Sequence, residues 1–77
     1  MTNRQKFELW EKIASRYRVS EKNQCVVCGK HAKHVYGMLT HTDSVVCSKK
    51  CSDIFIDVVT TNLDEFTSVA VEITGAI

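Results

Sequence analysis

Apolar residues near the N-terminus recur at the three- and four-residue spacing of one helical face. Between Thr2 and Arg18 this face contains Phe7, Trp10, Ile13, Ala14 and Tyr17. Thr2 followed by Gln5 fits a capping box, in which the two residues satisfy each other's backbone N–H groups. The pattern predicts an amphipathic helix over residues 1–19, with its Arg and Lys side chains largely off the apolar stripe. Because so short a chain has few other large apolar side chains, we expect the aromatic residues to fill the core.

The middle of the chain has the features of a β-hairpin. Strand-forming side chains occur at residues 35–39 and 45–46, and the intervening His41-Thr42-Asp43-Ser44 supplies a turn. Gly37 indicates either a bulge or a close approach of another backbone. We therefore expect a hairpin within residues 33–46.

From Ser48 the apolar period becomes helical again. The residues near one face are Cys51, Ile54, Phe55, Val58, Val59, Leu63, Phe66, Val69, Ala70 and Ile73. The β-branched run over residues 58–61 is poor helix material, and Asn62 with Glu65 forms a second candidate capping box. We expect one helix to about Thr60 and a second from Leu63, or else a single bent helix. Residues 68–74 also alternate like a strand, so the segment 61–77 is predicted as helix or strand.

The candidate chemistry lies in two cysteine pairs, Cys25-x2-Cys28 and Cys47-x3-Cys51, with 18 residues between them. In the first pair, Gly29 permits the positive φ that a tight turn around a metal requires. The second pair straddles a predicted helix start, where Ser48 is the expected N-cap. Four thiolates complete a closed tetrahedral site for Zn²⁺. The spacing therefore predicts one structural zinc.

Other uses of these cysteines fit the sequence less well. Two disulfides need an oxidising compartment, and a redox-active CxxC is expected within a βαβ unit, which this pattern does not predict. A catalytic zinc needs an open coordination position, which four thiolates do not leave. Either His31 or His34 is an alternative ligand, since Cys25, Cys28 and these two histidines recur every three residues. We expect both histidines to face solvent instead.

Residues 1–24 are polar throughout and contain neither the apolar stretch of a signal peptide nor a run long enough to cross a bilayer. We therefore expect a cytoplasmic protein without membrane association, in which thiols stay reduced and available for metal.

The net charge of +1 is unevenly distributed over the 77 residues. Residues 1–34 carry eight Lys or Arg and three Glu, whereas residues 35–77 carry two Lys and six Asp or Glu. This balance excludes a strongly basic DNA binder and an acidic mimic of nucleic acid. Either the molecule has one basic and one acidic face, or the two halves pack together and their charges cancel.

The segment from Cys25 to Ile56 resembles a treble-clef zinc finger. The knuckle CVVCGK and the helix start VCSKKCSDIF are similar to those of MYM/FCS-type fingers and of the small zinc-binding inhibitors of bacterial DNA gyrase. The resemblance implies that Cys25, Cys28, Cys47 and Cys51 ligate one Zn²⁺. It covers about 30 of the 77 residues, and such fingers serve many unrelated functions. Val26-Val27 stand where the gyrase inhibitors usually have a proline, so gyrase inhibition is not implied.

These observations predict a small α+β domain stabilised by zinc. We expect residues 1–77 to form a single domain, with an N-terminal helix at 1–19, a treble-clef finger at 25–60 made of knuckle, hairpin and helix, and a C-terminal extension at 61–77. A zinc staple fits the size, because apolar burial alone leaves so short a chain close to the edge of stability.

Three functions compete. A protein-binding regulator or adaptor, of a size that suits a phage or bacterial protein, fits the near-neutral charge, with the aromatic residues of the first helix as alternative interface anchors. A nucleic-acid binder is the alternative, with phosphate contacts from Lys30, Lys33, Lys49 and Lys50. A ββα-metal nuclease would use His34 or His41 as a base, but no histidine follows Cys51 to complete its metal site. We therefore expect a non-enzymatic module, without a small-molecule substrate, that binds protein rather than nucleic acid.

Overall fold

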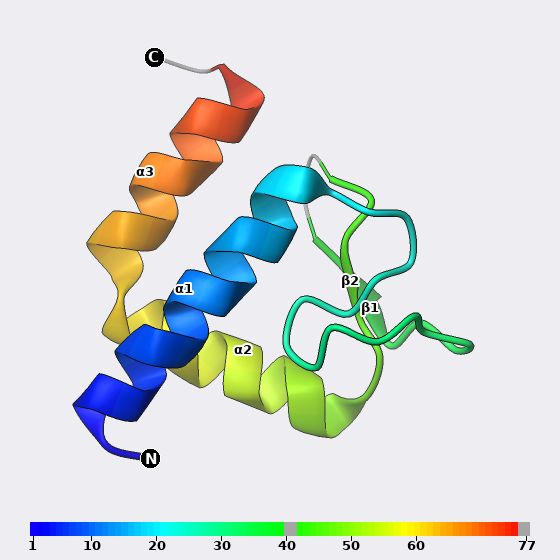
Figure 1. The fold of residues 1–77 in the computed structure, drawn as a ribbon, viewed down its shortest axis with the longest axis horizontal. Helices are drawn as coiled ribbons and strands as arrows, with labels where there is room; N and C mark the ends of the chain where they lie inside the picture. Colours follow the sequence, from blue (N-terminus) through cyan, green and yellow to red (C-terminus); the bar gives the residue numbers. More distant parts are fainter. Residues whose placement is uncertain (40–41, 76–77) are drawn as a thin grey trace.

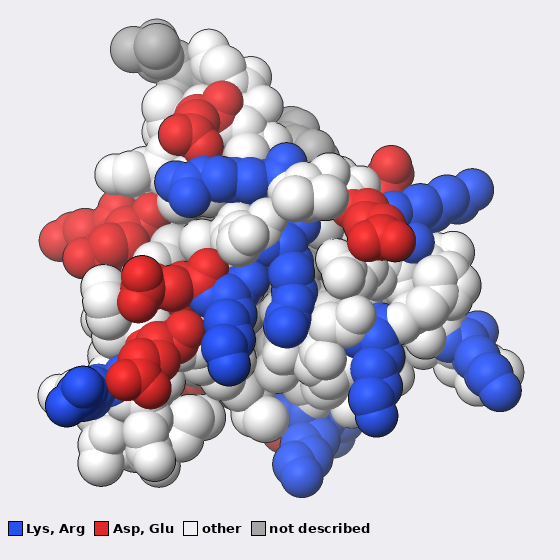
Figure 2. Space-filling model, viewed as in Figure 1, with Lys and Arg blue, Asp and Glu red and all other residues white. Residues whose placement is uncertain are grey.

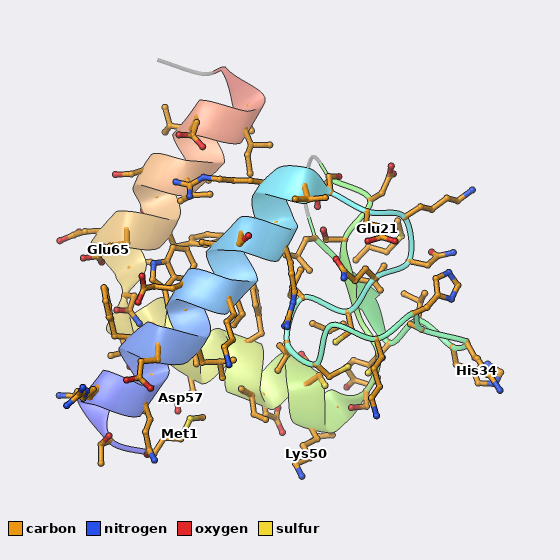
Figure 3. The ribbon with its side chains drawn as sticks, viewed as in Figure 1. Met1, Glu21, His34, Lys50, Asp57 and Glu65 are labelled. Atoms are coloured by element: carbon orange, nitrogen blue, oxygen red, sulfur yellow. The ribbon has the colours of Figure 1, made fainter. Side chains whose placement is uncertain are left out.

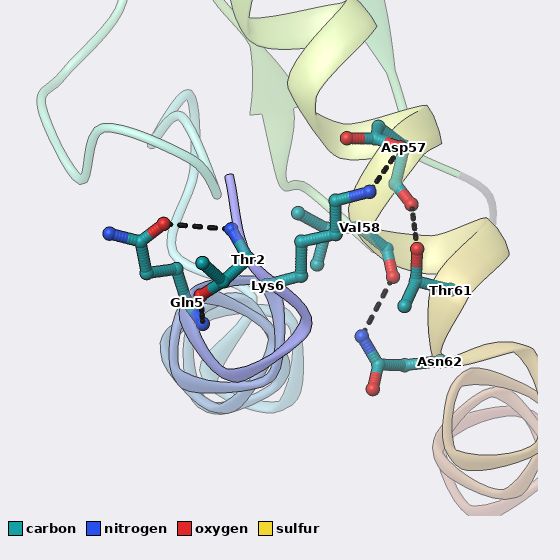
Figure 4. A network of polar contacts seen from close by, with 7 residues as sticks. All are labelled: Thr2, Gln5, Lys6, Asp57, Val58, Thr61 and Asn62. Atoms are coloured by element: carbon teal, nitrogen blue, oxygen red, sulfur yellow. Dashed lines mark hydrogen bonds and ion pairs between the residues drawn. The ribbon is translucent and has the colours of Figure 1, made fainter.

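In the computed structural model, which describes residues 1–39 and 42–75, the N-terminal pattern forms helix α1, Asn3–Val19 (Figure 1). Thr2 is its N-cap, and both bonds of the predicted capping box with Gln5 are present, at 2.8 and 3.2 Å (Figure 4). Ser20 ends the helix in a left-handed conformation, with φ of 56°, and its N–H donates to the carbonyl of Arg16. The predicted N-terminal helix is confirmed.

The apolar face of α1 is largely, but not wholly, buried. The buried members of the predicted stripe are Trp10, Ile13, Ala14 and Tyr17. Phe7 is 46 % exposed, so the expectation that it fills the core is wrong. Phe7 lies almost one turn before Trp10, in the N-terminal part of α1. This part of the helix extends past the elements that cover its later turns (Figure 1).

The hairpin consists of two short antiparallel strands, β1 (Gly37–Met38) and β2 (Val45–Val46). Gly37 pairs with Val46, and a Cβ atom at Gly37 would lie 3.3 Å from the Cγ2 atom of Val46. Gly37 therefore serves a close approach between strands. The predicted hairpin is confirmed in shorter form, and His41 of its predicted turn lies outside the described residues.

Two separate helices follow the hairpin, α2 (Lys49–Thr61) and α3 (Leu63–Thr74). The strand alternative for residues 68–74 is therefore wrong. The predicted capping box of Asn62 with Glu65 is also wrong, because the Asn62 side chain makes no capping bond to α3. Its amide Nδ2 instead donates to the carbonyl of Val58 at 2.9 Å, which satisfies the end of α2 (Figure 4).

The three helices and the two-stranded antiparallel sheet make a small α+β structure with its core where all of them meet. In Figure 1, α1 crosses in front of α2 and runs beside α3, with the hairpin at the opposite side. The ring of Phe66 lies edge-on to the rings of Trp10, Tyr17 and Phe55, at centroid distances of 6.0, 6.0 and 6.2 Å. Phe66 thus joins α3 to both α1 and α2.

Ion pairs connect the basic N-terminal part to the acidic C-terminal part. Lys6 of α1 pairs with Asp57 of α2 at 3.1 Å (Figure 4), and Arg18 of α1 pairs with Glu72 of α3 at 2.7 Å. The opposite charges of the two halves therefore cancel in part through packing. None of the helices in the described part of the chain is both long and apolar enough to span a membrane.

Candidate metal centre

The first cysteine pair lies on a tight turn between α1 and the hairpin. The N–H of Gly29 donates to the carbonyl of Cys25 at 2.9 Å, and the N–H of Cys25 donates to the carbonyl of Lys30 at 3.0 Å. Gly29 has a φ of +77°, as its position in the sequence predicted. This backbone turn brings Cys25 and Cys28 to one side of the chain, with Cys25 fully buried and Cys28 exposed.

The second pair joins the end of β2 to the first turn of α2. Cys47 directly follows the strand, and Cys51 is the third residue of the helix. Ser48 is the N-cap, and its Oγ accepts a hydrogen bond from the N–H of Cys51 at 3.2 Å, which confirms the predicted cap. The cap fixes the direction in which α2 leaves the strand, so both sulfur atoms face the knuckle.

The four sulfur atoms form one cluster in which all lie within 4.8 Å of one another. The Sγ atoms of Cys28 and Cys47 are 3.7 Å apart, and those of Cys47 and Cys51 are 3.6 Å apart. Zinc–sulfur bonds of about 2.3 Å in a tetrahedron place the sulfur atoms about 3.8 Å apart. A disulfide requires about 2.0 Å, and all four cysteines are free thiols. The donor set and its spacing therefore fit a single zinc ion.

The electrostatics of the cluster differ from one thiol to another. Burial opposes ionisation of Cys25, but hydrogen bonds from backbone N–H groups of Cys28, Cys47 and Val27 lower its pKa to about 6. A hydrogen bond with Cys51, together with burial, raises the pKa of Cys47 to about 12. Burial also raises the pKa of Cys51. The local environment therefore favours the thiolate at Cys25 and the protonated thiol at Cys47 and Cys51.

We predict that the protein loses zinc as the pH falls. Protons compete with the metal for the thiolates, and the raised pKa values of Cys47 and Cys51 show that these two thiols hold their protons firmly. Lowering the pH from 8 to 4 should release zinc to a chromogenic chelator, with loss of the far-ultraviolet circular dichroism at the same pH. Zinc that stays bound throughout this range would contradict a four-thiolate site.

Arg16 is a contributor to the site that the sequence analysis missed. Its Nη1 atom donates to the carbonyl of Val26 at 3.0 Å and to that of Val27 at 2.8 Å. A Cβ atom at Gly29 would lie 2.8 Å from Nη2 of Arg16, so the guanidinium also needs the space that glycine leaves. Arg16 therefore fastens α1 to the backbone between the two knuckle cysteines. Helical periodicity placed it off the apolar stripe and gave no signal of this contact.

We predict that Arg16→Met lowers the free energy of unfolding of the zinc-loaded protein by about 2–4 kcal/mol, because two carbonyls lose a charged donor. Arg18→Met is the matched control on the same helix. It removes only the exposed pair with Glu72, which should cost less than about 1 kcal/mol. Chemical denaturation of both variants measures the difference. Equal effects would show that Arg16 does not hold the knuckle.

The other residues predicted around the site lie on its surface. The side chains of Lys30, Lys33, Lys49 and Lys50 are all exposed. Lys49 is engaged with Asp53 at 3.2 Å. His31 and His34 are exposed and belong to no metal-binding group found among residues 1–39 and 42–75, and Figure 3 shows His34 pointing away from the body of the protein. The expectation that both histidines face solvent is confirmed.

Comparison with protein-family models, curated proteins and solved structures gives no significant match to this chain. The similarity to MYM/FCS-type fingers and gyrase inhibitors therefore rests on the motifs alone.

Proposed function

We propose that this chain is a non-enzymatic interaction module that a structural zinc stabilises and that binds a protein partner. In this proposal residues 25–60 are a treble-clef finger and residues 1–77 act as one domain. The observed order of knuckle, hairpin and helix supports the finger, with cysteines 25 and 28 on the knuckle and cysteines 47 and 51 around the helix start. One apolar cluster that joins α1, α2, α3 and β2 supports the single domain.

A structural role for the metal follows from the donor set. Four thiolates fill the tetrahedral coordination of zinc and leave no position for a substrate or an activated water. His31 and His34 lie outside the cluster, so neither is placed to act as a base on the metal. We accordingly propose a module without enzymatic activity, working in the cytoplasm, where thiols remain reduced.

The observation that carries the partner-binding proposal is an apolar groove of about 610 Å³. It lies among the hairpin, α2 and α3, with Phe55, Phe66 and Tyr17 of α1 in its lining. Two large apolar side chains that line it are mostly exposed, Met38 at 73 % and Ile56 at 58 %. Contiguous exposed apolar surface is a property of interaction sites more than of inert surfaces. The zinc stabilises this surface indirectly, because it holds the hairpin against the start of α2.

Affinity purification with zinc-loaded bait tests the proposal. A protein partner should co-purify, survive nuclease treatment and be lost when the groove carries Ile56→Glu with Val71→Glu. Val19→Glu is the matched control, since Val19 is 69 % exposed and lies outside the groove. Protein captured equally by all baits, or lost with nuclease, would contradict a protein-binding function at this groove.

Nucleic-acid binding is the second candidate, favoured by a set of unpaired cations. Five lysines take part in none of the ion pairs found among the described residues: Lys12, Lys22, Lys30, Lys33 and Lys50. Figure 2 shows basic side chains spread over α1 and the finger, with acidic side chains over α1, α3 and the finger side as well. Exposed lysines near a zinc–thiolate centre also offset its negative charge, which is why we rank this function second.

We predict no gel shift with DNA or RNA at micromolar protein and physiological salt. If binding occurs, Lys33→Glu with Lys50→Glu should weaken it similarly for all sequences, and affinity should fall steeply with salt. Lys49→Glu should weaken binding less, because Lys49 already pairs with Asp53. A salt-sensitive shift that depends on these lysines would reverse the order of the two proposed functions.

A further inference from the structure

We propose that the occupant of the apolar groove is a basic amphipathic helix of a partner protein. This inference rests on the proposed protein-binding function and names the kind of segment that the groove accepts. Its basis is the combination of an apolar lining, helical walls and a nearby acidic side chain, Asp64, that takes part in none of the ion pairs of the described residues.

The shape of the groove suits a helix. On α3 its lining residues are Phe66, Thr67, Ala70, Val71 and Thr74. These positions extend over two turns, about 12 Å along the axis, which matches three contacts of a docked helix at i, i+3 or i+4, and i+7. The alternative occupant, an extended strand, would have to pair with a hairpin whose strands are two residues long. That edge offers too few backbone groups to hold a strand.

The free charge around the groove is mainly acidic. Tyr17 of α1 contributes to the lining, and of the two arginines beside it, Arg16 binds backbone carbonyls of the knuckle and Arg18 pairs with Glu72. The other lining residues come from segments 35–46 and 51–75, which contain no Lys or Arg and whose acidic residues are Asp43, Asp53, Asp57, Asp64, Glu65 and Glu72. Three of these six already pair with Lys49, Lys6 and Arg18. Asp64 is exposed and takes part in none of the ion pairs of the described residues.

Asp64 lies close to the groove. It precedes Thr67 by three residues and Val71 by seven, so helical geometry places it on the same side of α3 as those lining residues. Leu63 beside it is 56 % exposed and extends the apolar surface at this end. Glu65, by contrast, faces a separate cleft between α1 and α3. A helix that places apolar side chains in the groove and Lys or Arg beside them would complement both the apolar lining and the carboxylate of Asp64.

A second copy of this chain is a poorer occupant. Its basic helix, α1, has most of its apolar face buried in the core cluster with α2 and α3, so it cannot offer that face without unfolding. The exposed Phe7 is a single side chain and does not make a stripe. We therefore infer that the helix that occupies the groove belongs to another protein.

Selection from a random 16-residue peptide library displayed on phage tests the inference. The bait is the zinc-loaded full chain, and the counter-selection uses the Ile56→Glu/Val71→Glu variant. We expect enriched peptides with positive net charge and apolar residues at helical spacing. Enrichment of acidic, uncharged or alternating strand-like peptides would overturn the inference while leaving the proposed protein binding intact. No groove-dependent enrichment would overturn the inference, and the affinity purification then decides separately whether the proposed function stands.

Reversal of the charge at Asp64 tests whether electrostatic attraction contributes to peptide binding at the groove. Fluorescence anisotropy of a selected peptide should show about fivefold weaker binding to Asp64→Lys, the size of one exposed ion pair, with a smaller difference at high salt. Glu21→Lys is the matched control, since Glu21 is exposed on the finger side (Figure 3) and should leave affinity unchanged. Equal affinity of the peptide for the unmodified chain, Asp64→Lys and Glu21→Lys would contradict a role of Asp64 in binding basic peptides. Sedimentation that shows a groove-dependent dimer would assign the surface to a second copy and contradict the inference.

Discussion

Removal of zinc should unfold the hairpin and α2 together. The cysteines join the knuckle to the end of β2 and the first turn of α2, and the sheet itself is small, with two residues in each of its described strands and one further bridge from Cys25 to Val45. Structural zinc contributes on the order of 10–16 kcal/mol in zinc-finger peptides at neutral pH, which exceeds the stability expected of so small a core. Far-ultraviolet circular dichroism with and without a strong chelator measures the effect.

The N-terminal helix should be lost in the same transition. Its 17 residues are close to the length at which isolated helices become marginal in water, and Arg16 and Trp10 fasten it to the knuckle and to α3. Partial loss of helix signal, with α1 intact, would indicate that α1 and α3 fold without the finger. Retention of the full signal in verified metal-free protein would show that the fold does not need zinc.

Substitution of single ligands should reproduce chelation. Cys47→Ser and Cys51→Ser each leave three thiolates and a hydroxyl, which is a poor zinc ligand, so both variants should lose metal and helix signal. His31→Ala and His34→Ala are the matched controls, because both side chains are exposed and outside the sulfur cluster. His41→Ala, at a residue outside the described part, should behave like them. Loss of zinc in any histidine variant would argue for a mixed ligand set.

Trp10→Ala should be the most damaging substitution away from the metal. Trp10 is 4 % exposed, belongs to the core cluster and lies edge-on to Phe66. Truncation of a buried Trp costs about 3–5 kcal/mol, through lost burial and the cavity left behind. That is most of the stability expected for a domain of this size. Thermal melts of zinc-loaded protein, followed by circular dichroism, should show a large fall in the midpoint.

Phe7→Ala is the control for this substitution. Phe7 lies on the same helix, but it is 46 % exposed, so its removal should cost less than about 1 kcal/mol. The pair of variants separates the two uses of aromatic residues that the sequence allows, core filling and surface anchoring. Similar destabilisation by both would mean that Phe7 is packed more tightly than its exposure indicates.

Local sequence signals predicted much of this structure. The capping boxes illustrate both the success and its limit. Thr2 and Gln5 satisfy each other across one turn, as predicted. Asn62 has the same spacing to Glu65, yet its side-chain amide turns back to the carbonyl of Val58, which also accepts from the backbone N–H of Asn62 at 3.1 Å. The sequence pattern identified a helix boundary at Asn62 but not the hydrogen-bond partner of its side chain.

The metal site also has features that the sequence predicted and features that it did not. Cysteine spacing, Gly29 and Ser48 are local features, and the structure brings the four sulfur atoms together as the spacing indicates. Arg16 reaches the knuckle only because α1 packs across it, so neither periodicity nor spacing reveals the contact. Phe7 and the apolar groove depend likewise on how far neighbouring elements extend over each face. These features require the tertiary arrangement.

X-ray absorption spectroscopy of purified protein, with metal content measured on the same sample, tests the four-thiolate zinc site most directly. We expect one zinc per chain and a first shell of four sulfur atoms at about 2.3 Å. Nitrogen in the first shell would contradict the proposed ligand set of Cys25, Cys28, Cys47 and Cys51. Folded protein that carries no metal, with four readily titrated thiols, would contradict the zinc site itself.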